Sequence, residues 1–254
     1  MLELYYREFG AGKPLLILHG LFGSSDNWQS LAQRFASFYR VICIDLRNHG
    51  RSPWHEEHNY EAMSDDLYAF MKAQGLNDII LLGHSMGGKV AMRFAQAYPH
   101  LINKLIVADM GIKAYPMHHQ HILAGIHSLH LETIGSRSEA EEILKIHVEN
   151  DGIRQFLLKN LYWIEKGKLA WRMNVAVLER EMPNILAALP EAECWTATLF
   201  LRGDLSNYIL EEDEEQILKQ FPDASIETIP HAGHWLHAEQ ADLFFDAVMG
   251  FSLR

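Results

Sequence analysis

Short apolar runs alternate along the chain with longer stretches in which apolar residues recur at helical spacing. Runs that are apolar at every position are typical of strands buried on both faces of a parallel sheet. Such runs lie at 15–18, 41–44, 79–82, 105–108 and 198–201, and further strands are expected within 1–10 and at 225–229. Helical spacing predicts helices starting near Asp26 and spanning 60–73, 90–98, 211–220 and 238–251. This alternation predicts an α/β fold with a mostly parallel sheet flanked by helices.

The alternation stops in the middle of the chain. Residues 112–190, which we call the insertion, are predicted to be mainly helical, with a capping box at 138–141 and a hairpin turn at Lys166-Gly167. The insertion holds nine basic and nine acidic residues, whereas the flanking parts hold 13 basic and 24 acidic residues. We therefore expect a core made of 1–111 and 191–254, with the insertion as a helical lid above the carboxyl edge of the sheet.

Charge, apolar runs and cysteine content indicate which partners and which cellular location to expect. The net charge of −11 argues against nucleic acid or an anionic membrane as a partner. No run approaches the roughly 20 apolar residues that cross a bilayer, and the start "MLELYYREFG" lacks the pattern of a signal peptide, so a cytoplasmic location is expected. Cys43 and Cys194 lie far apart in apolar contexts and are expected to be buried thiols.

Candidate chemistry is concentrated in "ILLGHSMGGKV", residues 80–90. Gly83-His84-Ser85-Met86-Gly87 matches the nucleophile elbow, a sharp strand-to-helix turn that exposes a serine hydroxyl. Small residues at 83 and 87 would let strand and helix approach closely. Ser85 is therefore the candidate nucleophile.

A serine nucleophile needs a base and an oriented acid. Among 15 histidines, His234 in "PHAGHWLHAEQ" lies between the last strand and the last helix, where the order serine, acid, histidine places the base. His231 and His237 are expected at the surface or at a helix start. His19 and His84 are expected to make structural hydrogen bonds.

Two carboxylates are candidates for the acid. Asp109 ends the strand after the nucleophile helix, and Asp204 lies in "LRGDLSNY" after the next core strand. Asp109 is preferred, with Asp204 as the alternative. Ser206 could then support the acid or the histidine with a hydrogen bond.

The backbone N–H groups of Leu21 and Met86 are the expected oxyanion hole, with that of Phe22 as the fallback donor. The glycine in "LHGLFGS" lets this loop pass close to the nucleophile. The histidine-rich run 117–121 lacks the spacing of a helical zinc site, so neither a metal nor an organic cofactor is expected. Candidate pocket residues in the insertion are Trp163, Trp171 and Arg172.

With these motifs in order, the chain resembles the α/β-hydrolase superfamily along its whole length and is similar to the small YbfF-type bacterial esterases. The resemblance rests on "HGLFGS", "RNHG", "GHSMGGK", "QFLLKN", "SNY" and "GHWLHAE". It implies a sheet of about eight strands, and carboxylesterase activity that extends to acyl-CoA thioesters. It also implies an acid on the strand after the nucleophile helix, which favours Asp109. Asp204 departs from the neutral residue usual at its position in this group.

The expected function is hydrolysis of a small-molecule acyl ester or thioester through an acyl-enzyme on Ser85. A carbon–carbon bond hydrolase or lyase would use the same three side chains, and only its substrates would distinguish it. A binding protein that keeps the fold without turnover is the alternative of a different class. Dehalogenase and epoxide hydrolase chemistry needs a carboxylate at position 85 and is disfavoured.

Overall fold

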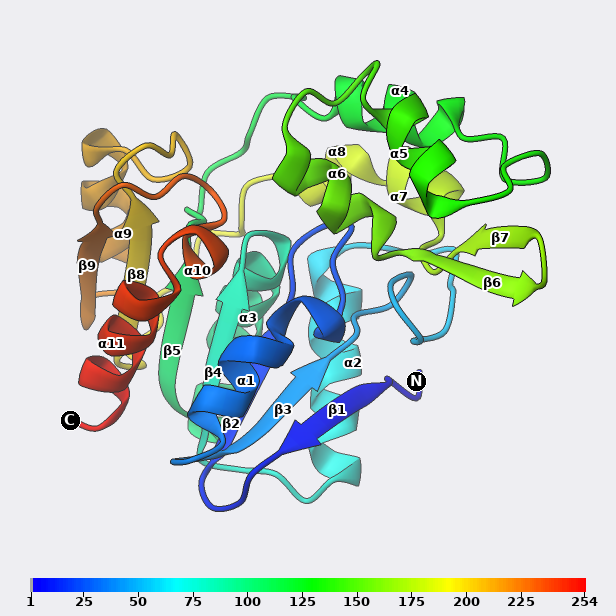
Figure 1. The fold of residues 1–254 in the computed structure, drawn as a ribbon. Coiled ribbons are helices and arrows are strands. Elements are labelled where there is room, and N and C mark those ends of the chain that lie inside the picture. The colour runs from blue at the N-terminus through cyan, green and yellow to red at the C-terminus, as the bar shows by residue number, and fades with distance from the viewer. Residues whose placement is uncertain (1) are drawn as a thin grey trace.

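Seven strands of the computed structural model, which describes residues 2–254, form one sheet in the order β1-β3-β2-β4-β5-β8-β9. Only β1 runs antiparallel to its neighbour, and all other pairs are parallel (Figure 1). The strands are β1 Tyr6–Phe9, β2 Pro14–Leu18, β3 Arg40–Ile44, β4 Ile79–His84, β5 Ile102–Ala108, β8 Thr198–Gly203 and β9 Ala224–Ile229. The predicted α/β fold with a mostly parallel sheet is confirmed, with seven strands in place of the expected eight or so.

Helices pack on both faces of the sheet. One hydrophobic cluster joins α2 and α3 to one face, and a second cluster joins α1 and α11 to the other. The apolar runs of the central strands β2, β3, β4, β5 and β8 are therefore buried on both sides, whereas the edge strands β1 and β9 are partly exposed. The core helices are η1 Ser25–Trp28, α1 Gln29–Phe35, α2 Tyr60–Ala73, α3 Met86–Ala97, η2 Pro99–Leu101, η3 Glu211–Asp213, α9 Glu214–Gln220, α10 Leu236–Glu239 and α11 Ala241–Ser252.

The prediction of one continuous last helix at 238–251 is wrong, because the structure has two helices there, α10 and α11. Gln240, with φ −132° and ψ 57°, is not helical and separates α10 from α11. In Figure 1, α10 lies at the end of α11 that is nearer the insertion, and α11 packs along the sheet.

The insertion lies between β5 and β8 and contains five helices and a hairpin. Its elements are α4 Gln120–Ser128, α5 Arg137–Leu144, α6 Asp151–Leu158, β6 Leu161–Glu165, β7 Lys168–Trp171, α7 Val175–Arg180 and α8 Met182–Leu186. Figure 1 shows them gathered above one end of the sheet. β6 and β7 pair only with each other, around a turn in which Gly167 has φ +84°.

The capping box expected at 138–141 is shifted. Ser136, and not Ser138, accepts a hydrogen bond from the Glu139 N–H and caps α5. The helix therefore begins two residues earlier than the sequence pattern suggested. Cys43 and Cys194 are both buried and unpaired, as expected, and burial raises the pKa of the Cys43 thiol to about 12.

Candidate active site

Ser85 occupies the turn between β4 and α3 with a strained backbone, φ 53° and ψ −121°. Such positive φ values are costly for a non-glycine residue and persist only where the surroundings enforce them. A Cβ at Gly83 would lie 2.2 Å from the Gly87 carbonyl oxygen, and one at Gly87 would lie 2.5 Å from the Leu18 carbonyl oxygen. Only glycine fits at either place, so the packing of strand against helix fixes the tight turn beneath Ser85.

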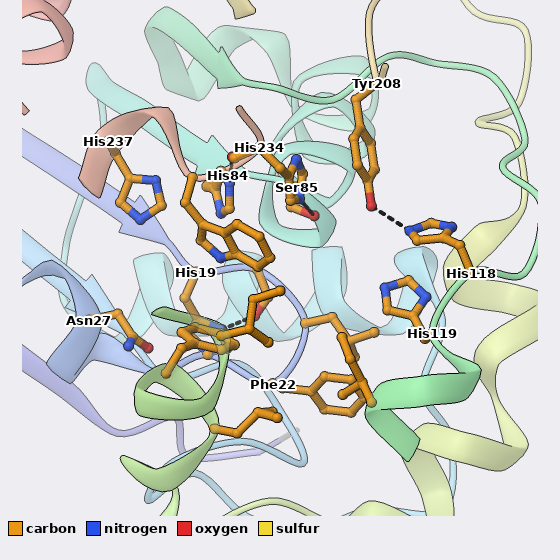
Figure 2. A pocket seen from close by; sticks show the side chains of 18 of the residues that line it. His19, Phe22, Asn27, His84, Ser85, His118, His119, Tyr208, His234 and His237 are labelled. Carbon is orange, nitrogen blue, oxygen red and sulfur yellow. Dashed lines mark hydrogen bonds between the residues drawn. The ribbon is translucent and has the colours of Figure 1, made fainter. Parts of the chain in front are cut away.

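Three side chains from distant parts of the chain meet at this turn. His234 Nε2 lies 2.9 Å from Ser85 Oγ, and His234 Nδ1 lies 2.7 Å from Asp109 Oδ2. The serine hydroxyl therefore donates to the imidazole, and the Nδ1–H donates to the carboxylate. Figure 2 shows His234 above Ser85 at the rim of a pocket. The spacing suits a base that removes the hydroxyl proton while the acid stabilises the resulting imidazolium.

Asp109 is fully buried at the end of β5, with φ 48°. Its Oδ1 accepts a hydrogen bond from the Gly203 N–H at 3.1 Å, and its Oδ2 accepts one from the Ser206 hydroxyl. These donors hold the carboxylate toward His234 and compensate for its removal from water. Of the two partners that the sequence left open for Ser206, its hydroxyl binds the acid, Asp109.

Asp204 lies elsewhere. Its side chain is exposed and its Oδ1 accepts a hydrogen bond from the Ala232 N–H at 3.0 Å. Backbone N–H groups of His231 and Ala232 keep the pKa of Asp204 below its usual value. The hydrogen bonds found within residues 2–254 include none between Asp204 and His234, so the alternative acid is a loop-forming residue.

Aromatic rings surround His234. Tyr208 stacks on its imidazole with centroids 3.9 Å apart, and His84 donates a hydrogen bond from Nε2 to the His234 backbone carbonyl at 2.8 Å. Burial, with His237 and His234 nearby, holds the pKa of His84 well below its usual value. His237 is buried and stacks on Trp28 at 4.4 Å, so it begins a helix as expected but is not a surface residue. His84 has the structural role that the sequence suggested.

The two expected oxyanion donors flank Ser85. Within residues 2–254, neither the Leu21 N–H nor the Met86 N–H has a hydrogen-bond acceptor. For Met86 this is expected, because it is the first residue of α3 and the first N–H groups of a helix have no partner within the helix. The Phe22 N–H, the fallback donor, is instead bound to His49 Nε2 at 3.1 Å. His19 donates from Nδ1 to the Gly20 carbonyl at 2.8 Å, which confirms its expected structural role.

A cavity of about 240 Å³ opens beside Ser85 (Figure 2). Its lining is mainly aromatic and aliphatic, and no Lys, Arg, Asp or Glu of residues 2–254 contributes to it. Burial lowers the pKa of His119 and of His237 to about 3 each, so these imidazoles are neutral at pH 7. The cavity can therefore hold an uncharged molecule of modest size.

The insertion supplies part of this cavity, through residues that the sequence did not single out as pocket residues. They are His118, His119, His121, Ile122, Ile153, Phe156 and Leu157. The residues suggested instead, Trp163, Trp171 and Arg172, are not among its lining. They belong to or follow the β6–β7 hairpin, which extends from the insertion away from β4 and α3 (Figure 1). The histidine-rich run 117–121 is the signal that could have pointed to this lining, because His118, His119 and His121 all belong to it.

Over residues 2–254, no group of three or more His, Cys, Asp or Glu side chains is arranged to bind a metal ion. No helix in the same range is long and apolar enough to span a membrane.

Known proteins resemble the chain over nearly its whole length. A family model described as "alpha/beta hydrolase fold" matches residues 13–124. A putative esterase/lipase of Haemophilus influenzae is 37% identical over 238 residues, covering 93% of this chain and 82% of that protein. Esterase YbfF of Escherichia coli is 36% identical over 237 residues, covering 92% and 91%. A solved structure described as a marine microorganism esterase matches with a TM-score of 0.96 and 41% identity, covering 99% and 100%. The chain therefore belongs to the α/β-hydrolase superfamily.

Proposed function

We propose that the protein is a serine esterase that cleaves small-molecule acyl esters through an acyl-enzyme on Ser85. The observation that carries the proposal is the hydrogen-bonded series from Ser85 through His234 to Asp109, at the wall of a cavity that no Lys, Arg, Asp or Glu of residues 2–254 lines. The names of the similar proteins, which include esterases from two bacteria, support the same reaction class.

The geometry supports a two-step acyl transfer. His234 Nε2 takes the Ser85 proton as Oγ attacks the ester carbonyl, and Asp109 stabilises the imidazolium that forms. The oxyanion of the tetrahedral intermediate accepts hydrogen bonds from the Leu21 and Met86 N–H groups. When the intermediate collapses, His234 gives its proton to the leaving alkoxide, and the acyl group stays on Ser85. Water, deprotonated by His234, then releases the acid and restores the serine.

We assign the core to 1–111 and 191–254 and propose that the insertion, 112–190, acts as a lid. His119, Ile122 and Phe156 line the cavity from the insertion, whereas Ser85 and His234 line it from the core. A substrate bound between them would be shielded from bulk water, which strengthens the electrostatic contacts that stabilise the oxyanion.

The cavity also bears on the substrate. Since no Lys, Arg, Asp or Glu of residues 2–254 lines the cavity, it fits an uncharged ester better than a substrate with a charged group that must be buried there. An acyl-CoA thioester uses the same chemistry, with its anionic portion outside the cavity. The balanced charge of the insertion would repel that portion less than the acidic core would.

The test is a panel of uncharged p-nitrophenyl esters and acyl-CoA thioesters of matched acyl length, assayed with the wild type and Ser85→Ala. We expect ester hydrolysis to exceed thioester hydrolysis in kcat/KM. Replacing Ser85 should lower kcat by about 10⁶-fold, as for other triad nucleophiles. Wild-type turnover in Ser85→Ala, or an inactive wild type, would refute the proposal.

A further inference from the structure

The loop that carries the Leu21 donor is a tight turn held in a strained form. The Gly23 N–H donates to the Gly20 carbonyl at 2.9 Å, which closes a four-residue turn. Its third residue, Phe22, has φ 60°, whereas Leu21 is not among the residues with positive φ. This combination defines a type II turn, which normally needs glycine at the third position. Phe22 is buried, so the strain must be offset by specific contacts.

The first contact fixes the direction of the donor. The Gly20 carbonyl accepts hydrogen bonds from His19 Nδ1 at 2.8 Å and from the Gly23 N–H. In a planar trans peptide the N–H points opposite to the carbonyl. The Leu21 N–H of that same peptide is therefore directed away from these partners.

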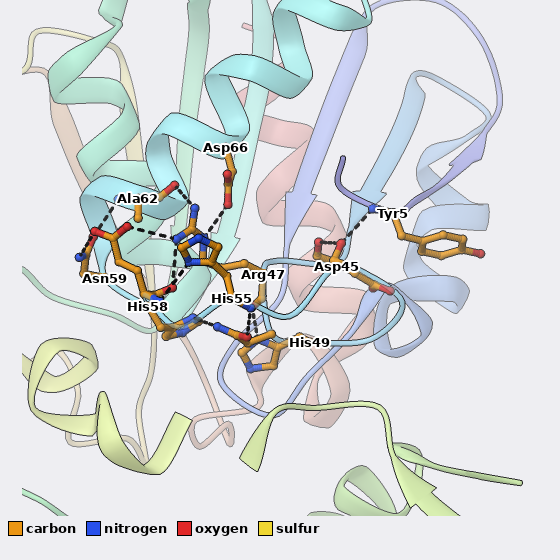
Figure 3. A network of polar contacts seen from close by, with 12 residues as sticks. Tyr5, Asp45, Arg47, His49, His55, His58, Asn59, Ala62 and Asp66 are labelled. Atoms are coloured by element: carbon orange, nitrogen blue, oxygen red, sulfur yellow. Dashed lines mark hydrogen bonds and ion pairs between the residues drawn. The ribbon is translucent and has the colours of Figure 1, made fainter. Parts of the chain in front are cut away.

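The second contact comes from the segment after β3. His49 Nε2 accepts the Phe22 N–H at 3.1 Å, and its Nδ1 donates to the Arg47 carbonyl at 2.9 Å. Arg47 is itself anchored, because its guanidinium pairs with buried Asp66 at 2.6 Å (Figure 3). Burial lowers the pKa of His49 to about 3, so its Nε2 remains an acceptor at neutral pH. His49 thus binds the Phe22 N–H from a rigid support.

The third contact comes from the insertion. Asn160, between α6 and β6, donates from Nδ2 to the Phe22 carbonyl at 2.7 Å. Asn160 is only 4% exposed, and its own backbone carbonyl accepts a hydrogen bond from the Arg172 N–H at 2.8 Å. The Phe22 residue is therefore bound on its N–H side by the core and on its carbonyl side by the insertion.

We propose that His49 and Asn160 are positioning residues for the reaction, which hold Phe22 in its left-handed conformation and so keep the Leu21 N–H aligned with the oxyanion. The inference rests on the proposed function. In this arrangement the insertion does more than cover the cavity, since it sets the geometry of a loop in the core. Without either partner the Leu21–Phe22 peptide is held less firmly and Phe22 can relax to negative φ, which loosens the turn that carries the Leu21 N–H.

The test compares Asn160→Leu, which keeps the side-chain size but removes the donor, with His49→Leu and His49→Gln. Glutamine reaches about as far as Nε2 and offers an acceptor oxygen, so it is the rescue variant. The readouts are kcat and KM on a p-nitrophenyl ester, and the inhibition constant of a trifluoromethyl ketone. This ketone forms a tetrahedral adduct on serine whose oxyanion occupies the donor site.

Losing an oxyanion donor costs about 10²- to 10³-fold in kcat, so a misaligned donor should cost about 10- to 100-fold. We expect this loss for Asn160→Leu and His49→Leu, with KM within about threefold and weaker ketone inhibition by a similar factor. His49→Gln should recover most of the loss. Because both side chains hold one residue, the double leucine variant should lose less than the product of the single losses.

The matched control is Arg180→Gln, which removes another contact between the insertion and the core, that of Arg180 with Glu56 at 2.8 Å. It should leave kcat and ketone inhibition within twofold of the wild type. The inference is overturned if kcat and ketone inhibition of both leucine variants stay within twofold of the wild type, or if their losses are no larger than that of Arg180→Gln. Equal losses in His49→Leu and His49→Gln overturn the role of His49. Failure of the proposed function is distinguishable, because it would appear as an inactive wild type or an active Ser85→Ala.

Discussion

The ring of Tyr208 stacks on the imidazole of His234, with 3.9 Å between centroids and 14° between planes. The Tyr208 hydroxyl in turn lies 2.6 Å from His118 Nε2 in the insertion. The proposed base is thus held by Asp109 at its edge and by Tyr208 at its face. This arrangement restricts rotation of the imidazole away from Ser85.

Removing the stacked ring should therefore weaken catalysis moderately. Aromatic pairs contribute about 0.5–1.5 kcal/mol beyond their burial, which corresponds to about 2- to 10-fold in rate. Tyr208→Leu should lower kcat by this factor, and Tyr208→Phe, which keeps the ring, should stay within twofold. Steady-state kinetics on one ester checks both, and equal losses in the two variants would show that the hydroxyl, not the ring, matters.

Replacing Asp109 and replacing Asp204 should have very different effects on kcat. Asp109→Asn keeps the shape of the side chain but no longer stabilises the imidazolium, and a triad acid changed in this way can cost about 10⁴-fold in kcat. Asp204→Asn should change kcat by less than about threefold, because its carboxylate binds the Ala232 N–H and not His234. Kinetics of the pair decides the assignment, and the reverse ranking would overturn it.

A buried lysine makes stability depend on pH. Lys89 on α3 is fully buried and donates from Nζ to the carbonyls of Lys113, at 2.8 Å, and Ala187. It thus holds both ends of the insertion against the nucleophile helix. Burial lowers the pKa of Lys89 from 10.5 to about 7.

Between those two pKa values the unfolded chain binds a proton that the folded chain lacks, so raising the pH favours folding. The free energy of unfolding of the wild type should therefore increase, relative to that of Lys89→Met, from pH 7 to pH 10. Urea titrations of both proteins across this range measure the difference. A difference that stays constant or falls with pH would show that Lys89 keeps its proton on folding.

Chelation should leave activity unchanged, because each proposed step uses only side chains and backbone N–H groups. His118 is engaged by Tyr208 and by the Pro116 carbonyl, which it approaches at 2.7 Å, and so is not free for a metal. Hydrolysis rates before and after EDTA treatment check this. A loss that zinc restores would indicate a metal site in the run 117–121.

The sequence predicted those parts of the fold that depend on residues close together in the chain. The fully apolar runs gave the buried strands, and "GHSMG" placed Ser85 on its turn, because steric fit at Gly83 and Gly87 depends on neighbours in sequence. Helix ends were predicted less precisely: Ser136 and not Ser138 caps α5, and the sequence pattern alone does not separate the two, because each serine is followed three residues later by a glutamate.

Contacts between distant segments were beyond reach of such patterns. The partner of Phe22 in the insertion, Asn160, is 138 positions away, and nothing in "QFLLKN" shows where its last side chain points. The same holds for the cavity lining, where His119 contributes and Trp163 does not. Asp109 and Asp204 both directly follow a parallel strand, β5 and β8, so strand-end position alone does not separate them. Only the contacts do, since Asp109 lies 2.7 Å from His234 and Asp204 binds the Ala232 N–H.

The central claim is that Ser85 is an activated nucleophile, and covalent labelling tests it most directly. The wild type is treated with a fluorophosphonate, digested and mapped by mass spectrometry, alongside Ser85→Ala and His234→Ala. We predict one adduct on the peptide containing Ser85, no adduct in Ser85→Ala and much slower labelling in His234→Ala. Labelling of Ser85→Ala to the same extent, or an unlabelled but folded wild type, would contradict the account.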